Sequence, residues 1–363
     1  MVASQDRFLD SKLKPAPKMY AYGLEPLRAI WNDDLKLDLK LNYYKKRYGN
    51  CRFDLNAALL YQAFMLLKKR HFTISQAFSQ KNTLIFNQAV ANLSLDDFYY
   101  CLEFLKDNKE RLITHLNKQI NVKNERDIST VYYDILEFEF PEAEYEEESL
   151  ISVIIFMDDL GYPLDFEIYD GADDEFETLK ASLERLKSQY KITEALDIQD
   201  CELENDADDL ESYDPLKESI CFFKACLSTE EMTVAQFQGR ILLSMMTLLC
   251  LRCLDDRLES HDYLLDQKRI IKALNKAFVA PFSQGSELYF LKLEGEEKFY
   301  VDPDPKFSYQ VTLDEDEALD LDKIMQVSKL KPLDNVNTSD NLRSCFMRNL
   351  YDEILPKKLL ESL

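Results

Sequence analysis

The pattern of apolar and polar positions between residues 129 and 169 predicts three strands. The first segment alternates β-branched and aromatic residues with a period of two, and it carries one carboxylate, Asp134. The second is a continuous apolar run of strand length, which is typical of a strand buried on both faces. A turn sequence from Asp158 to Gly161 separates it from the third. The predicted strands cover residues 129–140, 151–157 and 163–169.

The period changes to that of a helix after residue 176. Leu179, Leu183, Leu186 and Tyr190 recur at helical spacing, and residues 178–191 contain neither Gly nor Pro. Three strands followed by a helix predict an α/β or α+β core. Because the 363 residues include only 7 glycines and 11 prolines, we expect a compact, helix-rich protein of the α+β class.

Helical patterns also precede and follow this core. Asp54 and a capping box at Ser94 mark the starts of two early helices, the second reaching about Gln119. Beyond the core, residues 262–280 predict a helix with Leu264 facing inward, and residues 287–293 and 298–301 predict a hairpin. The expected parts are a basic helical domain (1–128), the first half of the core (129–192), an acidic linker (193–215), a helical second half (216–282) and a variable carboxyl-terminal region (283–363).

Charge is distributed unevenly along the chain. The net charge of −23 argues, taken whole, against a nucleic-acid-binding protein. However, residues 1–130 hold 21 Lys+Arg against 14 Asp+Glu, a net of +7. Residues 131–214 hold 4 against 28, a net of −24. A basic first part joined to an acidic middle indicates an organised asymmetry.

The sequence predicts a soluble, cytoplasmic protein without a membrane partner. Its eight cysteines lack the rhythm of a disulfide scaffold, and the first residues lack a signal-peptide pattern. The longest apolar run, residues 241–251, is too short to span a bilayer and is flanked by arginines. Cys250 and Cys253 have the spacing of a zinc or redox pair, but they lie in this apolar helix, which favours core packing.

Three motifs of the core carry a resemblance to a known family. They are YYDILEFEF (132–140), DDLGYPLDFEIYDG (158–171) and TLKASLERLK (178–187). Together they resemble the start of the catalytic domain of bacterial insertion-sequence DDE transposases, and the resemblance extends from about Tyr20 to about Phe282. It implies a ribonuclease-H-like fold in which three carboxylates hold two divalent metals, Mg²⁺ or Mn²⁺, for DNA strand cleavage and transfer. Asp134 would be the first carboxylate, although a lone Asp in a strand more often caps, pairs or faces solvent.

Residues 194–214 depart from the pattern that the resemblance implies. The family places a fourth strand with the second catalytic Asp here, followed by a β-rich insertion. This segment holds ten acidic residues, no basic residue and few β-formers, so we predict an acidic linker and no strand. If a metal site is nevertheless complete, Asp197, Asp200 or a carboxylate within 202–214 would have to complete it.

The resemblance resumes with two helices, at residues 216–224 and 235–254. The family pattern has a Tyr and an Arg before the catalytic Glu and a Lys seven positions after it. With Lys224 as that Lys, the Glu position falls on Lys217, beside Glu218, and the Arg and Tyr positions hold Tyr213 and Leu210. The resemblance therefore implies Asp134, Glu218 and Lys224 as candidate catalytic residues, with Asp134 and Glu218 as candidate metal ligands and the phosphate-binding Arg replaced.

Two basic clusters suit a DNA-contacting amino-terminal module, the region in which the family recognises element ends. The alternative interpretation is that basic residues at helix ends complement the helix dipole. The candidate DNA-binding residues are Lys45, Lys46, Arg47, Lys68, Lys69 and Arg70.

Two functions compete on this interpretation of the sequence. One is a DNA transposase whose metal site is completed by other carboxylates. The other is a non-catalytic, transposase-derived protein that occupies insertion-sequence ends, forms a homodimer, or pairs with an intact transposase as an inhibitor. The apparent absence of the second Asp strand favours impaired catalysis. An acidic DNA mimic or protein-interaction module is a third possibility, which only the acidic residues 131–214 support.

Overall fold

The computed structural model describes residues 19–85, 88–124, 126, 128–140, 149–170, 175–198, 214–230, 232–284, 286–293 and 314–346. Within them, the protein is a helix-rich α+β structure with two four-stranded sheets, which confirms the expected class. The chain divides into two compact units. The sheet unit comprises Leu27–Lys81 and Ala89–Gln267, and the hairpin unit comprises Met1–Pro26, Asn82–Gln88 and Lys268–Leu363. The five predicted parts stay a prediction.

The sheet unit is organised around the three predicted strands and a fourth. Its strands are β2 (Thr130–Phe140), β3 (Ser149–Met157), β4 (Pro163–Asp170) and β5 (Glu194–Asp197), in the order β4-β3-β2-β5. The pairs β2–β3 and β3–β4 are antiparallel, whereas β5 runs parallel to β2. β2, β3 and β4 confirm the three strands predicted for residues 129–140, 151–157 and 163–169.

The prediction that residues 194–214 contain no strand is wrong at their start. β5 is held by its ladder with β2: the Thr193 amide donates to the Ser129 carbonyl at 2.8 Å, and the Ile198 amide donates to the Tyr133 carbonyl at 2.9 Å. This pairing is non-local, so it compensates for a segment with weak intrinsic strand preference. Residues 199–213, most of the expected acidic linker, lie outside the described residues.

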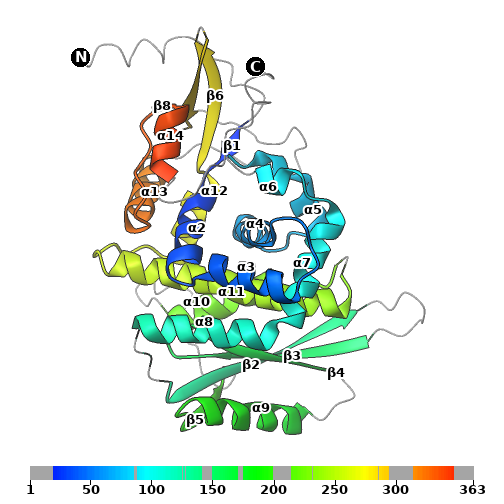
Figure 1. The fold of residues 1–363 in the computed structure, drawn as a ribbon. Coiled ribbons are helices and arrows are strands. Elements are labelled where there is room, and N and C mark those ends of the chain that lie inside the picture. Colours follow the sequence, from blue (N-terminus) through cyan, green and yellow to red (C-terminus); the bar gives the residue numbers. More distant parts are fainter. Residues whose placement is uncertain are drawn as a thin grey trace. The chain divides into compact units, whose positions relative to one another are not determined.

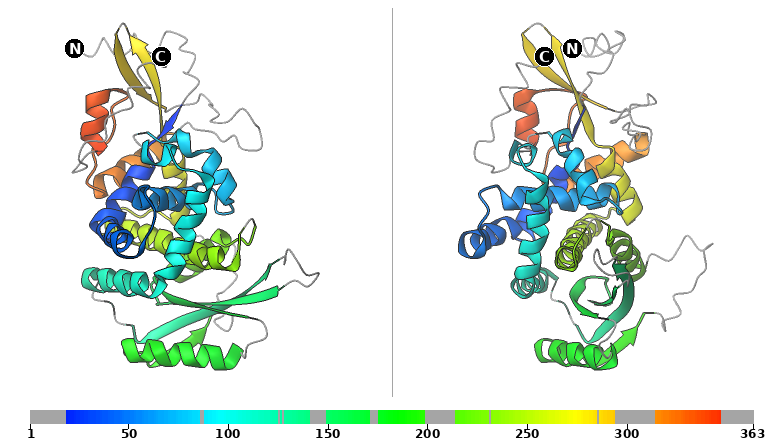
Figure 2. Two further views of the ribbon diagram at one scale, coloured as in Figure 1. Left: turned by 45° about the vertical axis from the view of Figure 1, so that its right-hand side comes forward. Right: turned by 90° about the vertical axis from the view of Figure 1, so that its right-hand side faces the viewer.

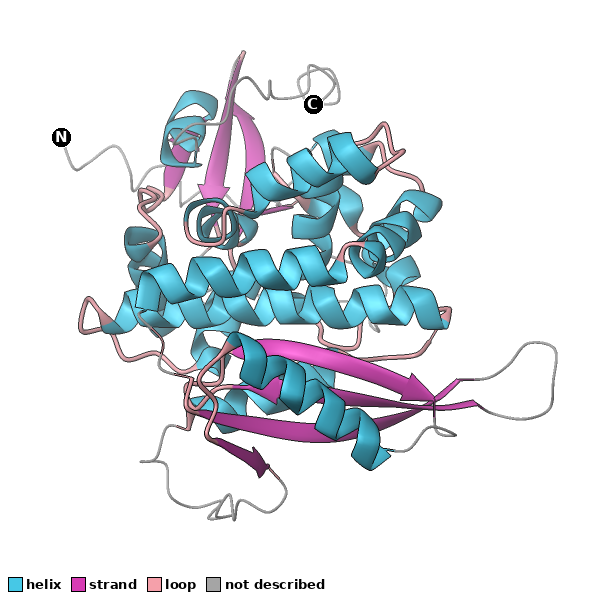
Figure 3. Cartoon of the chain, turned by 60° about the horizontal axis from the view of Figure 1, so that its bottom comes forward, coloured by secondary structure: helices cyan, strands magenta, loops and turns pink. Residues whose placement is uncertain are grey.

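Helices cover both faces of this sheet (Figures 1 and 3). α9 (Glu175–Gln189) lies on one face, and α8 (Lys109–Asn124), α10 (Pro215–Cys226) and α11 (Val234–Glu259) lie on the other. The core under α9 combines alternate positions of β2 with the four apolar positions predicted from helical spacing. These are Val131, Tyr133 and Ile135 on the strand and Leu179, Leu183, Leu186 and Tyr190 on or just after the helix.

The earlier helices begin where the caps predict. They are α2 (Leu24–Asp33), α3 (Leu37–Tyr48), α4 (Leu55–Lys68), α5 (Ile74–Ser79), α6 (Gln88–Ala91) and α7 (Leu95–Asp107), with a 3₁₀ turn, η1 (Lys81–Thr83), before α6. Asp54 accepts a hydrogen bond from the Ala57 amide, and Ser94 forms its capping box with Asp97. The single helix predicted up to Gln119 is instead broken at Asn108, a buried residue whose side-chain amide donates to the Phe104 carbonyl at 2.9 Å.

α11 is the central helix of the sheet unit. By length and composition it could cross a membrane, alone among the helices described, but 78% of its apolar window is buried inside the structure, as in a core helix of a soluble protein. Cys250 and Cys253 are fully buried, which confirms core packing. A Cβ at Gly239 would lie 1.9 Å from the Leu102 carbonyl oxygen, so only glycine permits this approach to α7.

The hairpin unit contains the second sheet, in the order β1-β6-β7-β8 (Figure 2). Its elements are β1 (Tyr20–Ala21), α12 (Gln267–Asn275), β6 (Phe278–Gln284), β7 (Glu287–Lys292), α13 (Glu315–Val327), β8 (Val336–Thr338) and α14 (Ser339–Phe346). The predicted helix 262–280 is wrong at both ends, because Leu264 is 82% exposed ahead of α12 and Phe278 begins a strand. β7 pairs with β6, and residues 298–301 lie outside the described residues.

Candidate functional site around Asp134

Asp134 lies in β2 on the face of the sheet that carries α10 and α11. Successive strand residues point to opposite faces. Tyr133 packs under α9, whereas Phe138 contacts Phe237 of α11 with ring centroids 5.0 Å apart, so the even-numbered positions face α10 and α11. Asp134 is 1% exposed, and its neighbour across the ladder is Ile155. A carboxylate so placed is removed from water and requires a partner.

That partner is Lys224, in the last turn of α10. Its Nζ lies 2.7 Å from Oδ2 of Asp134, and the lysine side chain is 43% exposed. The contact is an ion pair without hydrogen-bond geometry, since neither carboxylate oxygen has a hydrogen-bond partner in the described part of the chain. The structure thus brings two of the predicted catalytic residues together and leaves the buried carboxylate with unused acceptor capacity.

The other predicted residue, Glu218, lies near the start of α10. This helix begins after Asp214, whose carboxylate accepts hydrogen bonds from the amides of Leu216 and Lys217. At about 100° per residue, Lys217 lies within about 20° of the direction of Lys224, whereas Glu218 lies about 120° away. The side of the helix that carries Lys224 therefore presents a second lysine at the family's Glu position, and the metal-binding role of half-buried Glu218 stays a prediction.

The turn between β3 and β4 fixes the start of α10, which gives the DDLGYP motif a structural role. Gly161 has φ +73°, and a Cβ there would lie 2.5 Å from the Pro215 carbonyl oxygen and 2.5 Å from the Ser219 hydroxyl. Asp158 organises this turn: it accepts hydrogen bonds from the Tyr162 amide and from Arg126, each at 2.7 Å. Burial raises the pKa of Asp158, and Arg126 opposes the shift.

β5 brings a second carboxylate, Asp197, beside the strand of Asp134. The register pairs Asp197 with Tyr133. Paired positions of neighbouring strands share a face of the sheet. The register therefore assigns Asp197 to the α9 face, opposite Asp134. Asp200 and the carboxylates of residues 202–213 lie outside the described residues, and Asp214 caps α10.

The described residues do not fit the two-metal site that the resemblance implies. Among them, no group of three or more His, Cys, Asp or Glu side chains could hold a metal ion. Two-metal chemistry requires carboxylates that converge on ions about 4 Å apart. Here Asp134 faces the ammonium of Lys224, and position 217, on the same side of α10, is another lysine.

The first predicted DNA-binding cluster lies at the carboxyl end of α3. Lys46 and Arg47 are exposed, while Lys45 is half-buried and donates to the Phe53 carbonyl. Arg47 donates to the Tyr43 hydroxyl at 2.8 Å and lies over the ring of Tyr48, with 5.6 Å to the centroid. Two of the three cations are therefore available to an anionic partner, as DNA contact requires.

The second cluster, at the end of α4, is less accessible. Lys69 is exposed, but Arg70 lies 5.3 Å from the Phe222 ring centroid. Although Lys68 is half-buried as a whole residue, burial of its ammonium lowers its pKa to about 7. A lysine that is partly neutral at physiological pH is a weak phosphate contact. Both clusters stay predictions, and the first is the better placed.

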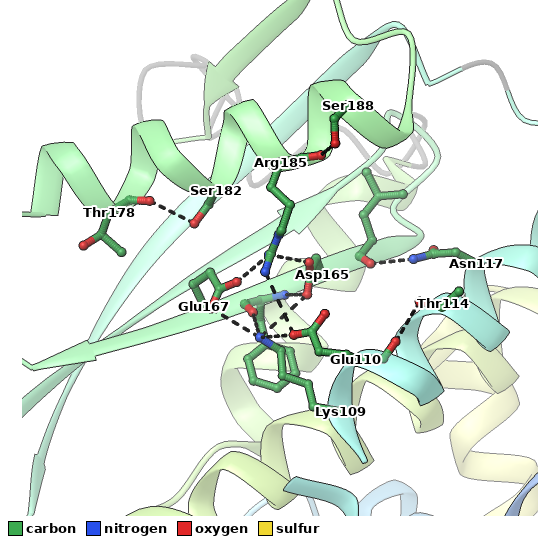
Figure 4. Close-up of polar contacts among 12 residues, drawn as sticks. Lys109, Glu110, Thr114, Asn117, Asp165, Glu167, Thr178, Ser182, Arg185 and Ser188 are labelled. Carbon is green, nitrogen blue, oxygen red and sulfur yellow. Dashed lines mark hydrogen bonds and ion pairs between the residues drawn. The ribbon is translucent and has the colours of Figure 1, made fainter. Parts of the chain in front are cut away.

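A second charged cluster, which the sequence patterns did not single out, surrounds Asp165 on β4 (Figure 4). Asp165 is 4% exposed and accepts hydrogen bonds from the Phe166 amide at 2.8 Å and from Arg185 at 2.6 Å. Lys109 lies 3.9 Å from it, and Glu167 pairs with both cations. Burial raises the pKa of Asp165 to about 6, against the opposing effect of Lys109 and Arg185.

The same cluster covers the free edge of the sheet. β4 is an outer strand, and its carbonyls of Phe166 and Leu164 accept hydrogen bonds from Lys109 at 2.6 Å and Asn117 at 2.8 Å. Side chains of α8 thereby occupy carbonyls that would otherwise be open to another strand. The only sequence signal at Asp165 is a carboxylate within a strand, and its partners come from distant segments.

No family model, curated protein or solved structure matches this chain.

Proposed function

We propose that this protein is a transposase-like DNA-binding protein of DNA transposition in which strand cleavage is impaired. The observation that carries the proposal is the ion pair of Asp134 with Lys224, on the side of α10 where position 217 is lysine. The Lys224 ammonium supplies Asp134 with the positive charge that a metal ion would supply in an active site. Two-metal catalysis normally fails when one metal carboxylate is removed.

The order of elements in the sheet unit supports the ribonuclease-H-like ancestry. Three antiparallel strands are followed by α9, by a fourth strand parallel to the first, and then by α10 and α11. This is the order that the resemblance implies, including the strand for a second Asp. The ancestry rests on this order together with the three core motifs.

A second candidate function, an active transposase, is favoured by β5. The strand expected to carry the second catalytic Asp is present beside β2 and ends at Asp197. Because the register assigns Asp197 to the face opposite Asp134, a carboxylate outside the described residues, such as Asp200, would have to complete a site for Mg²⁺ or Mn²⁺ on this alternative. Glu218 would then be the third ligand, and Asp134 would exchange Lys224 for a metal.

The partners proposed for the protein follow from its basic first part. Insertion-sequence ends would bind the amino-terminal helices, chiefly through Lys46 and Arg47. A homodimer or a complex with an intact transposase would let a cleavage-impaired protein act as an inhibitor. Such a role places the protein in the cytoplasm, with no membrane partner.

Metal binding separates the two candidates. Isothermal titration calorimetry with Mg²⁺ or Mn²⁺ would compare the wild type, Asp134→Ala and Asp165→Asn, the last of which removes another buried strand carboxylate. For an impaired protein, we expect no stoichiometric binding to any of the three. Binding that is abolished in Asp134→Ala and kept in Asp165→Asn would overturn the impairment and favour the active transposase.

DNA binding tests the part that both candidates share. Fluorescence anisotropy with a labelled duplex at low salt should show binding that weakens with salt. The double variant Lys46→Ala/Arg47→Ala should bind more weakly, with a salt slope smaller by about 0.9 for each phosphate that the variant no longer neutralises. Lys187→Ala, an exposed lysine on α9, is the matched control and should bind like the wild type. Absence of duplex binding in the wild type would contradict the proposed function.

A further inference from the structure

Two tyrosines of α3, Tyr43 and Tyr48, are large aromatic residues that expose nearly half of their surface to solvent. Tyr43 is 49% exposed and Tyr48 is 44% exposed. The helix is held instead by Leu37, Leu41 and Tyr44, which are buried. The Tyr44 hydroxyl also donates to the Arg111 carbonyl of α8 at 3.2 Å. The rings of Tyr43 and Tyr48 lie against that of Tyr44, with centroids 5.7 and 5.9 Å away, yet nearly half of each side chain remains exposed.

Cations surround these two rings. Arg111 lies 4.3 Å and Arg47 5.6 Å from the centroid of Tyr48, and Lys40 lies 5.9 Å from that of Tyr43. The Tyr43 hydroxyl accepts a hydrogen bond from Arg47, which fixes the ring beside the guanidinium. Residues three and four apart on a helix are neighbours, so α3 places Lys40, Tyr43 and Arg47 together, while α8 contributes Arg111. The contacts hold the rings in defined positions while nearly half of each side chain stays open to solvent.

The local charge is opposite to that of the whole chain. From Lys36 to Tyr48 there are five lysines and arginines and one carboxylate, Asp38, in a protein of net charge −23. Asp38 is half-buried, and burial raises its pKa. Such a local excess of positive charge indicates an anionic partner, and the open rings indicate that this partner also presents flat apolar faces.

We infer that this part of α3 and α8 binds single-stranded DNA, with unpaired bases stacked on Tyr43 and Tyr48. We name it the α3 surface: Lys40, Tyr43, Lys46, Arg47, Tyr48 and Arg111. Proteins that bind single strands combine aromatic rings, on which bases stack, with cations that follow the phosphates. Intact duplex DNA would use only the cations, because its bases are already stacked on one another.

The inference rests on the proposed function and makes it more specific. A protein that acts at the ends of a DNA element meets both duplex and unpaired nucleotides. The α3 surface would favour the unpaired ones, so that the protein would bind a frayed or single-stranded end more tightly than the continuous duplex.

Fluorescence anisotropy with labelled poly-dT and with a labelled duplex tests the inference. The wild type should bind poly-dT more tightly than the duplex at equal salt. Tyr43→Ala and Tyr48→Ala should each weaken poly-dT binding about tenfold, the order of one stacked base. Both should leave duplex binding nearly unchanged. Tyr48→Phe, which keeps the ring, should bind poly-dT like the wild type.

Two controls make the result decisive. Phe176→Ala removes an exposed aromatic from α9, 68% exposed between two glutamates, and should change nothing. Unlabelled poly-glutamate should compete with poly-dT far less well than poly-dT itself does. Thermal unfolding of each variant would verify that it is folded.

The failures of the inference and of the proposed function are distinguishable. If the duplex binds but poly-dT binds no more tightly, or if the tyrosine variants bind poly-dT like the wild type, the inference is overturned and the proposed function stands. Equal competition by poly-glutamate would also overturn it, since the surface would then be selecting charge alone. If neither DNA binds, both fail.

Discussion

Two buried strand carboxylates of the same sheet, Asp134 and Asp165, have very different surroundings. Asp165 accepts hydrogen bonds from a backbone amide and from Arg185, and it has Lys109 nearby. Asp134 has one partner, Lys224, whose side chain is 43% exposed, and its oxygens have no hydrogen bond within the described residues. The two carboxylates are thus almost equally buried, but within the described residues only Asp165 accepts hydrogen bonds.

The difference indicates that Asp165 has a structural role, whereas Asp134 has the surroundings of a candidate functional site. Buried polar groups in folded proteins are nearly always satisfied, and an exception calls for a functional or historical explanation. The cluster around Asp165 ties α8 and α9 to β4, which accounts for every charge in it. Among the described residues, the one ion pair of Asp134 joins only α10 to β2, so structural contacts account for this buried carboxylate less fully than for Asp165.

The largest expected effect comes from separating α10 from the sheet. Gly161→Ala places a Cβ 2.5 Å from the Pro215 carbonyl oxygen at a positive φ, so the turn and α10 must move apart. Positive φ and overpacking together predict a loss of roughly 2–5 kcal/mol in the free energy of unfolding, measurable by urea denaturation. Leu160→Ala, at an exposed neighbour, should stay within about 0.5 kcal/mol of the wild type. A Gly161→Ala protein of wild-type stability would mean that this turn does not position α10.

Removal of single cations tests the comparison directly. Lys224→Met leaves the Asp134 charge buried without a partner, and we expect a loss of ~2–3 kcal/mol. This loss is smaller than the ~3–5 kcal/mol expected when a fully buried ion pair is broken, because Lys224 is partly exposed. Arg185→Met should cost less, ~1–2 kcal/mol, since Lys109 and the Phe166 amide remain near Asp165.

A double variant controls for the loss of the lysine itself. Asp134→Asn combined with Lys224→Met should recover most of the stability in urea unfolding, because no unpaired charge is left. Equal losses for Lys224→Met and Arg185→Met would show that the two carboxylates depend on their cations alike, and the distinction would not hold.

Local sequence patterns sufficed for the elements whose signals are local. The alternation in β2, the apolar run of β3, the helical spacing of α9 and the caps at Asp54 and Ser94 each correspond to an observed element. β5 was missed because Glu194 to Asp197 becomes a strand only by pairing with β2, more than 60 residues earlier. The break at Asn108 was missed for a similar reason, since it lets Lys109 reach the carbonyl of Phe166 on β4.

The candidate site could be predicted only in part from the sequence. The family resemblance pointed to Asp134 and Lys224, and the structure pairs them. It could not show that the partner of Asp134 is a lysine ammonium, because that depends on where α10 docks. Nor could it show that the register pairs Asp197 with Tyr133, since a shift of one residue exchanges the faces of a strand.

A pH dependence is the next smaller effect expected from the Asp165 cluster. Burial raises the pKa of Asp165 to about 6 in the folded protein, from its ordinary value of 3.8. Between these values the folded state keeps a proton that the unfolded state has released. The stability that protonated Asp165 contributes is therefore complete below pH ~4 and is lost as the pH rises to about 6. The full shift corresponds to ~3 kcal/mol, and we expect ~1–2 after relaxation and water entry.

Urea unfolding of the wild type and Asp165→Asn between pH 4 and 7 would measure this term. The stability of the wild type relative to the variant should fall across the window, while Glu167, Lys109 and Arg185 remain in both proteins. Asp107→Asn removes the same charge from an exposed position and reports the effect of overall charge alone. A relative stability that rises with pH would mean that the two cations outweigh burial at Asp165.

The smallest effect is expected at the rim of the same cluster. Glu110 lies 3.7 Å from Lys109 and 4.0 Å from Arg185, but its side chain is 68% exposed. Water screens such pairs, so Glu110→Gln should change the free energy of unfolding by less than about 0.5 kcal/mol. Glu167→Gln, at the less exposed carboxylate that pairs with both cations, is the matched comparison and should cost more. If Glu110→Gln cost as much as Glu167→Gln, the cluster would extend into solvent as one network. Burial and direct pairing would then no longer explain why Asp165 is satisfied and Asp134 is not.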